Sequence, residues 1–203
     1  MFLKLKSLSL VGLEAEVVEI EVDIHRGLPS FQIVGLPDAA IQESRERVRS
    51  AIKNSGFAFP TGKISINLAP ANLRKHGPRF DLAIALGILC ATHQITLRKN
   101  PKKTVFVGEL GFSGELREIT GVLPTTSDAH KLGFEEIFVP EKNAKEASLI
   151  PHINVFGVRN LRELVDHFSE IEEIAPQKSQ TLKPKNAPEA LEYDMMHVCG
   201  NEH

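Results

Sequence analysis

The chain has 203 residues, of which 42% are hydrophobic and 25% charged, and its net charge is -2. These values are typical of a soluble globular protein with one sizeable core, and so small a net charge does not by itself indicate a nucleic-acid, membrane or acidic partner. Two cysteines provide no disulfide framework and indicate a reducing compartment, so we expect a cytoplasmic protein.

The first residues of the chain alternate apolar and polar side chains. This pattern predicts a strand and differs from the continuous apolar segment of a signal peptide. The longest apolar run, residues 82–91, has about half of the roughly 20 residues that a membrane-spanning helix needs. We therefore expect no contact with a membrane.

Two further strands and a helix are predicted before residue 60. Residues 14–24 alternate and predict a half-buried strand, and a short strand follows at residues 31–34. The strand ends at Gly35-Leu36-Pro37-Asp38, where Asp38 can cap the helix that follows. Gly56 is placed to end that helix.

Basic side chains lie away from the apolar stripe of this helix. They are Arg45, Arg47, Arg49 and Lys53. A basic face of this kind is usually solvated, and contact with phosphate groups is the alternative that we keep open.

The middle of the chain predicts a strand, a polar loop and a buried helix. Residues 63–68 alternate, residues 69–78 form the loop, and residues 80–90 are apolar nearly all round. Asp81 falls in the first turn of this helix, where the helix dipole favours a carboxylate.

The remaining pattern completes an α/β arrangement. Residues 105–107 and 137–139 predict buried strands, and residues 123–132 predict a helix closed by Gly133. Strands that alternate with helices indicate an α/β layer fold for residues 1–170. Residues 171–192 contain three prolines among polar residues and predict a linker, which leaves residues 193–203 as the start of another module.

Three stretches, in matching order, resemble the proteolytic domain of Lon. The resemblance implies a two-layer, mixed-sheet α/β domain of the ribosomal-protein-S5-domain-2-like type. The stretches are Gly35-Leu36-Pro37-Asp38 with Glu43-Ser44; residues 64–70 followed by Lys75-His76-Gly77-Pro78-Arg79; and residues 107–143, including Ala129-His130-Lys131-Leu132-Gly133.

The resemblance also places the two catalytic positions of Lon on this chain. The nucleophilic serine corresponds to Arg79 and the catalytic lysine to Leu123. A Ser-Lys dyad needs a hydroxyl group that attacks and an amine that accepts its proton, and neither group is present at these positions. We therefore expect no catalytic residues in this chain, and a degenerate serine protease that uses another serine is the alternative.

Particular strings narrow the resemblance to the ComM/YifB family of magnesium-chelatase-like proteins. These strings are residues 30–37, 66–71 and 77–83. In this family such a domain precedes a hexamer-forming AAA+ ATPase module, and residues 194–202 resemble the residues before its Walker A loop. The resemblance implies an ATP-driven motor that acts on DNA, with branch migration in recombination and natural transformation as its task.

The sequence contains no phosphate-binding loop of the G-x-x-x-x-G-K-[ST] type. We therefore expect no cofactor in this chain, and ATP and magnesium to bind the ATPase module that it lacks. Gly108, Gly111 and Gly114 have the wrong spacing for a nucleotide loop and are better explained as turn residues.

Arg74, Lys75 and Arg79 are the candidate nucleic-acid-binding residues. With His76 they place three fixed charges and an imidazole on the loop that enters a helix, where backbone N–H groups also favour anions. The alternative is that Arg79 fills the vacated nucleophile position and pairs with a carboxylate such as Asp81. A protein-interaction adaptor without DNA binding is the third functional class.

Two other clusters are weaker candidates. Residues 98–103 contain four basic residues without aromatic neighbours, which favours a solvated loop. His197, Cys199 and His203 have no second cysteine pair, so we expect no metal site there.

Overall fold

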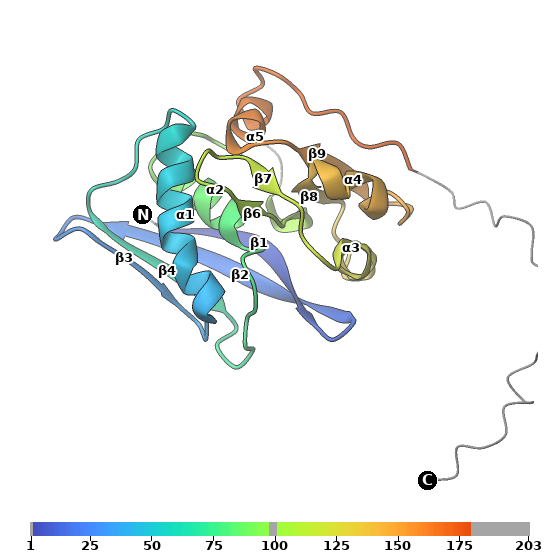
Figure 1. Ribbon diagram of the computed structural model, residues 1–203, viewed down its shortest axis with the longest axis horizontal. Helices are drawn as coiled ribbons and strands as arrows, with labels where there is room; N and C mark the ends of the chain where they lie inside the picture. The colour runs from blue at the N-terminus through green and yellow to red at the C-terminus, as the bar shows by residue number, and fades with distance from the viewer. Residues whose placement is uncertain (1, 98–100, 180–203) are drawn as a thin grey trace, which may run out of the picture.

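The computed structural model describes residues 2–97 and 101–179 of the chain (Figure 1). A four-stranded sheet has the order β1-β2-β4-β3. Strands β1 and β2 form an antiparallel hairpin, β2 pairs antiparallel with β4, and β3 pairs parallel with β4. The strands are β1 (Phe2–Val11), β2 (Glu14–His25), β3 (Ser30–Val34) and β4 (Lys63–Ala69).

Helix α1 (Ala39–Asn54) connects the parallel strands β3 and β4. As predicted, the Asp38 carboxylate caps the helix and accepts a hydrogen bond of 2.9 Å from the Ile41 amide. Gly56 follows the helix with a positive φ of 84°, a conformation that favours glycine. The sequence therefore encodes both ends of this crossover.

Side chains of α1 also cover the outer strand β3. Ser30 donates to the Gly62 carbonyl, so the backbone groups of Ser30 turn towards β4 and those of Phe31 and Ile33 turn the other way. Gln42 donates to the Ile33 carbonyl at 3.2 Å, and Arg45 donates to the Phe31 carbonyl at 3.5 Å. The outward carbonyl groups of the edge strand thus have partners within the chain.

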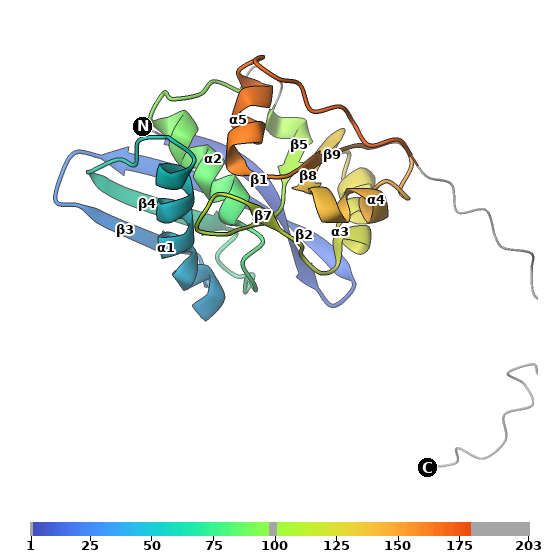
Figure 2. The ribbon, with the colours of Figure 1, turned by 45° about the horizontal axis from the view of Figure 1, so that its top comes forward.

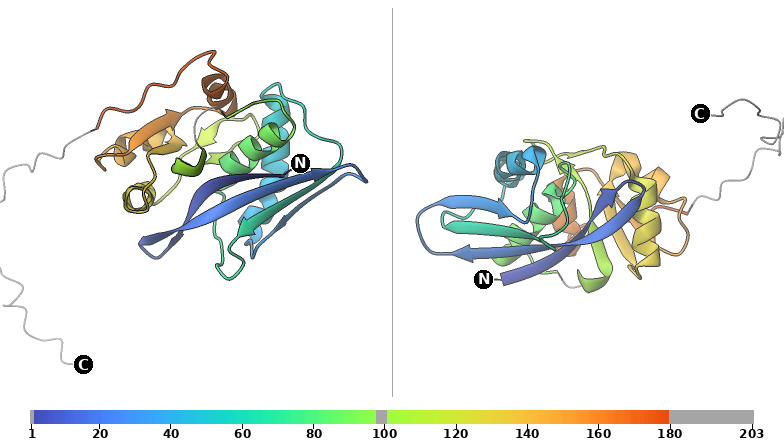
Figure 3. Two further views of the ribbon diagram at one scale, coloured as in Figure 1. Left: turned by 180° about the vertical axis from the view of Figure 1, so that it is seen from behind. Right: turned by 90° about the horizontal axis from the view of Figure 1, so that it is seen from below.

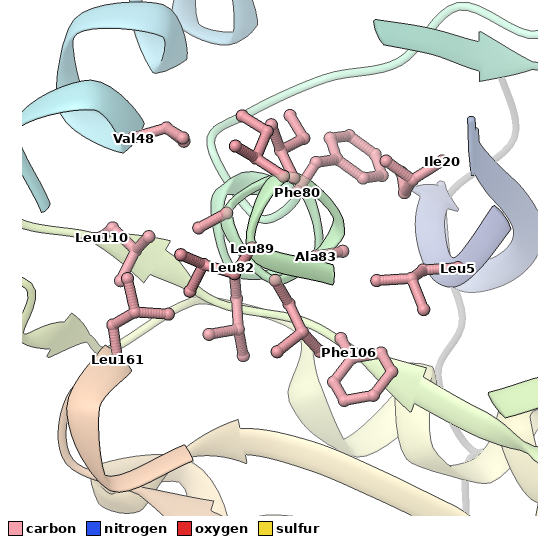
Figure 4. Close-up of a cluster of buried hydrophobic side chains, with 14 of the residues drawn as sticks. Leu5, Ile20, Val48, Phe80, Leu82, Ala83, Leu89, Phe106, Leu110 and Leu161 are labelled. Atoms are coloured by element: carbon pink, nitrogen blue, oxygen red, sulfur yellow. The ribbon is translucent and has the colours of Figure 1, made fainter. Parts of the chain in front are cut away.

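Helix α2 (Asp81–Ala91) lies at the centre of the molecule, and all of its residues are buried. Figure 4 shows the helix end-on, with Val48 of α1, Leu110, Leu161, Phe106 and Ile20 on successive sides of it. Seen from behind in Figure 3, the four-stranded sheet lies along one side of the molecule, with α1 and α2 over its inner face. This environment explains why residues 81–91 are apolar all round.

The second half of the chain forms a smaller parallel sheet with the order β5-β8-β9. Phe138 stacks between Phe106 and Phe156, with ring centroids 5.3 and 4.7 Å apart. Figure 2 shows α5 beside α2 and α4 beside this sheet. The elements are β5 (Thr104–Phe106), β6 (Glu109–Leu110), β7 (Leu116–Arg117), α3 (Val122–Lys131), β8 (Glu136–Pro140), α4 (Glu141–Ala147), β9 (Asn154–Val158), α5 (Leu161–Phe168) and a 3-10 turn at Pro101–Lys103.

The prediction of a two-layer α/β fold is confirmed by this arrangement. The structure gives residues 171–179 no helix or strand, although the Ile174 amide donates to His167 at 3.0 Å and the Gln177 amide to the Val155 carbonyl at 2.7 Å. Several predictions fall outside the described residues. They concern the remainder of the expected linker, residues 193–203 with His197, Cys199 and His203, and the first part of the basic cluster at residues 98–100. Within the described ranges, no helix is both long and apolar enough to cross a bilayer.

Candidate functional site

The loop between β4 and α2 docks onto the turn between β3 and α1. The Lys75 ammonium group donates to the carbonyl oxygens of Gly35, at 2.9 Å, and of Pro70. The second carboxylate oxygen of Asp38 accepts from the Gly77 amide at 2.9 Å, and the Lys75 amide donates to the Leu36 carbonyl. Two sequence motifs about 40 residues apart therefore form one structural unit.

Lys75 is completely buried within this unit. Burial lowers the pKa of its ammonium group, and the hydrogen bonds to carbonyl oxygens retain the group in the interior. Lys75 therefore braces the loop against the turn, and its charge does not lie on the surface.

Arg79 is also buried, with 8% of the residue exposed. Its guanidinium group donates to the Thr125 hydroxyl at 3.2 Å and to the Thr120 carbonyl at 2.8 Å. Burial lowers the pKa of Arg79. The residue thereby joins the start of α2 to the segment that leads into α3.

Arg79 does not pair with Asp81, the carboxylate that the alternative interpretation named. Asp81 is fully buried and instead accepts from Arg47 of α1 at 2.7 Å, from the Ser44 hydroxyl and from the Leu110 amide at 3.3 Å. The two side chains leave the start of α2 in different directions, because Asp81 reaches α1 while Arg79 reaches α3.

The Arg47–Asp81 pair was missed in the sequence, where Arg47 belongs to a basic face that we expected to be solvated. Only 13% of the Arg47 side chain is exposed, and its guanidinium group also donates to the Ser44 hydroxyl and the Ala40 carbonyl. Burial raises the pKa of Asp81, and the hydrogen bond from Arg47 opposes that effect. In turn, the carboxylate of Asp81 stabilises the charged form of Arg47. The pair fixes α1 against α2 in the interior.

Leu123 lies at the start of α3, half-buried, and its amide donates to the Glu146 carboxylate at 3.1 Å. Arg79 bonds to Thr125 of the same helix, two residues beyond Leu123. Because residues two apart point to different faces of a helix, this contact does not place the Leu123 side chain beside the guanidinium group.

A cavity of about 410 Å³ lies next to Arg79. His76 and Glu118 are exposed residues of its lining, and Glu109 and Thr120 contribute to its walls. Glu109 is paired with Arg117 at 3.2 Å. The cavity is therefore open to the surface at His76 and Glu118, and the buried residue Arg79 forms part of its wall.

Of the three candidate nucleic-acid-binding residues, only Arg74 is exposed. His76 is exposed next to it, with its imidazole 3.5 Å from the Asp38 carboxylate. The same loop thus has an outer side with Arg74 and His76, and an inner side formed by Lys75 and Arg79.

These observations define a two-layer α/β domain with a cavity beside Arg79, the residue at the position expected for the nucleophile. Residues 20–143 match the family described as subunit ChlI of Mg-chelatase. The chain belongs to this Mg-chelatase-like family, and within it to the ComM/YifB group.

Several relatives support this assignment. The chain is 37% identical over 199 residues to the competence protein ComM of Haemophilus influenzae, which covers 95% of the chain and 38% of ComM. It is 46% identical over 152 residues to YifB of Salmonella typhimurium, covering 75% of the chain and 30% of YifB. The DNA repair protein RadA of Streptococcus pneumoniae is 36% identical over 88 residues, or 43% of the chain and 20% of RadA. The chain thus spans little more than a third of the length of these relatives at most.

Proposed function

We propose that the chain is the non-proteolytic N-terminal domain of a hexameric, cytoplasmic AAA+ ATPase that acts on DNA, where it guides the DNA or regulates the motor. Branch migration in recombination and natural transformation is the proposed task. The observation that carries the proposal is the similarity to a competence protein over 95% of the chain. Part of the chain is also similar to a DNA repair protein, and this similarity supports DNA as the partner.

The site supports a role without peptide cleavage. The position of the expected nucleophile holds a buried arginine, and the position of the expected general base holds a leucine. In the proposal, ATP and magnesium bind the ATPase module, which also provides the hexamer contacts. In this proposal, the nucleotide site and the hexamer contacts both lie outside residues 1–170.

We expect Arg74→Glu to weaken DNA binding by about 5- to 10-fold at moderate salt and to reduce the dependence of affinity on salt by roughly one to two charges. Arg74 is the exposed member of the basic loop, so it is the cation that can reach a phosphate group. Fluorescence anisotropy with single-stranded, duplex and branched DNA across a salt series measures both quantities.

Arg26→Glu is the matched control, because Arg26 is exposed in the loop between β2 and β3 and the substitution changes the net charge equally. An equal loss for both variants would reveal a general charge effect and would remove Arg74 from the proposed interface. Binding by the full-length protein alone would assign DNA contact to the ATPase module and leave this domain a regulatory role.

Lys75→Met is expected to destabilise the domain, whereas Arg74→Met is expected to leave its stability nearly unchanged. The methionine removes the ammonium donor from the carbonyl groups of Gly35 and Pro70, of which Pro70 keeps the Leu73 amide at 3.4 Å. This loss in the interior costs about 1 to 3 kcal/mol of unfolding free energy. Arg74→Met changes the exposed neighbour and is expected to alter stability by less than about 0.5 kcal/mol. Urea unfolding of both variants tests the structural role of Lys75, and equal stabilities would contradict it.

The two alternative functions make separate predictions. A degenerate serine protease would be labelled by a fluorophosphonate probe, whereas the proposed domain is not. A protein-interaction adaptor would show no salt-dependent binding of DNA either in this chain or in the full-length protein.

A further inference from the structure

Within the part of the chain that the structure describes, the guanidinium group of Arg79 has no negatively charged partner. Among residues 2–97 and 101–179, its hydrogen bonds go to a threonine hydroxyl and a backbone carbonyl, both of which are neutral. An arginine side chain has five N–H donors, so these two bonds do not use its full capacity. Burying a cation without a counter-charge is costly, and such groups in proteins are normally paired.

The cavity beside Arg79 is large enough to hold a small anion. Its volume of about 410 Å³ falls within the range of roughly 300 to 1,000 Å³ typical of sites for small molecules. Arg79 lines the cavity, and the exposed residues His76 and Glu118 mark where the cavity meets the solvent. A small solute can therefore enter the cavity from outside and come next to Arg79.

The other charges of the cavity limit the size of the ligand. Glu118 and Glu109 both contribute carboxylates to the lining, and Glu109 is already paired with Arg117. These carboxylates repel a polyanion at the surface, while a small anion that reaches Arg79 gains a direct ion pair in a poorly solvated place. A planar guanidinium group matches the oxygen atoms of carboxylate and phosphate groups.

We propose that this cavity is a binding site for a small oxyanion, a compound with a phosphate or carboxylate group that pairs with Arg79. The site is separate from the DNA contact proposed for Arg74, because Arg74 is not among the residues that line the cavity. It makes the position expected for the nucleophile a place for ligand binding.

The test is thermal unfolding and isothermal titration calorimetry of the chain with sodium phosphate and with sodium acetate, at constant ionic strength adjusted with sodium chloride. At about ten times its Kd, a bound anion raises Tm by roughly 3 to 6 °C. A rise with phosphate alone identifies a phosphate site, and a rise with acetate alone identifies a carboxylate site. Equal unfolding temperatures in phosphate, acetate and chloride overturn the proposal.

Variants connect the effect to the cavity. Arg79→Met is expected to abolish the rise in Tm, whereas Arg74→Met, which changes an exposed arginine of the same loop, retains it. Glu118→Gln changes an exposed residue and removes a repulsive carboxylate, so it is expected to tighten anion binding by roughly two- to fivefold. If Arg79→Met does not fold, the Glu118→Gln variant decides the question, and unchanged affinity in that variant counts against the site.

A short single-stranded oligonucleotide separates the small ligand from a nucleic acid. The oligonucleotide is added at the same concentration of phosphate groups as the sodium phosphate. A rise in Tm that depends on Arg79 and occurs with the oligonucleotide but not with sodium phosphate would overturn the proposal in favour of the DNA backbone. A rise with sodium phosphate that the oligonucleotide does not reproduce supports it.

Discussion

Arg47→Ala is expected to lower the free energy of unfolding by about 3 to 5 kcal/mol, because it removes one partner of a buried ion pair. Asp81 has no exposed surface, and Arg47 supplies two of its hydrogen bonds at 2.7 and 3.3 Å. Without the guanidinium group, the carboxylate must either stay charged in the interior or take up a proton. Equilibrium unfolding in urea, followed by circular dichroism, measures the loss.

Lys53→Ala is the matched control on the same helix, since Lys53 is an exposed cation near the end of α1. Its loss is expected to change stability by less than about 0.5 kcal/mol. The double variant Arg47→Met with Asp81→Leu removes both charges and should recover much of the stability, because apolar residues of similar size often replace a buried pair at little cost. Equal stabilities of the Arg47→Ala and Lys53→Ala variants would show that the pair contributes nothing.

Gly35→Ala is the second substitution with a large expected effect, roughly 3 to 5 kcal/mol from combined steric overlap and backbone strain. Gly35 has φ of +99°, and a Cβ atom at this position would lie 2.2 Å from the carbonyl oxygen of Leu68 in the neighbouring strand. Neither backbone can move away easily, because the Gly35 carbonyl is also bonded to the buried Lys75. The measurement is again the free energy of unfolding.

Gly12→Ala separates the two causes. Gly12 also has a positive φ, of 66°, but no atom lies within 4 Å of the place where its Cβ would be. We therefore expect only the conformational cost at Gly12, about 1 to 2 kcal/mol. If both variants lose the same stability, the close approach of Gly35 to β4 has no energetic role.

Local sequence patterns predicted much of the fold. The alternation in β2 and β4, the Asp38 cap and the glycines after α1 and α3 are each encoded within a few residues, so they are visible without the tertiary structure. The smaller sheet was harder to predict from the sequence. Helix α4 and strand β9 are short, and a strand of five residues that is buried among aromatic side chains has no clear alternation to reveal it.

The site depends on contacts between distant segments, which explains why its details were not predictable. From the sequence, the basic residues of the loop were treated as one group of candidates for DNA contact, but nothing in their order shows that Lys75 and Arg79 turn inward while Arg74 stays outside. Likewise, Arg47 and Asp81 are 34 residues apart, and only the packing of α1 on α2 makes them partners. Side-chain direction on an irregular loop follows from the tertiary fold, which a single sequence does not display.

The covering of β3 by α1 has a consequence for how copies of the domain can meet. An exposed outer strand is a template on which another chain can extend the sheet, and this is a common route to aggregation. Gln42 and Arg45 already occupy the outward carbonyl groups of Ile33 and Phe31, so a strand from a neighbouring copy would have to displace them before it could add to this edge. At this edge, a neighbouring copy of the domain would therefore meet the side chains of α1 before it met the backbone of β3.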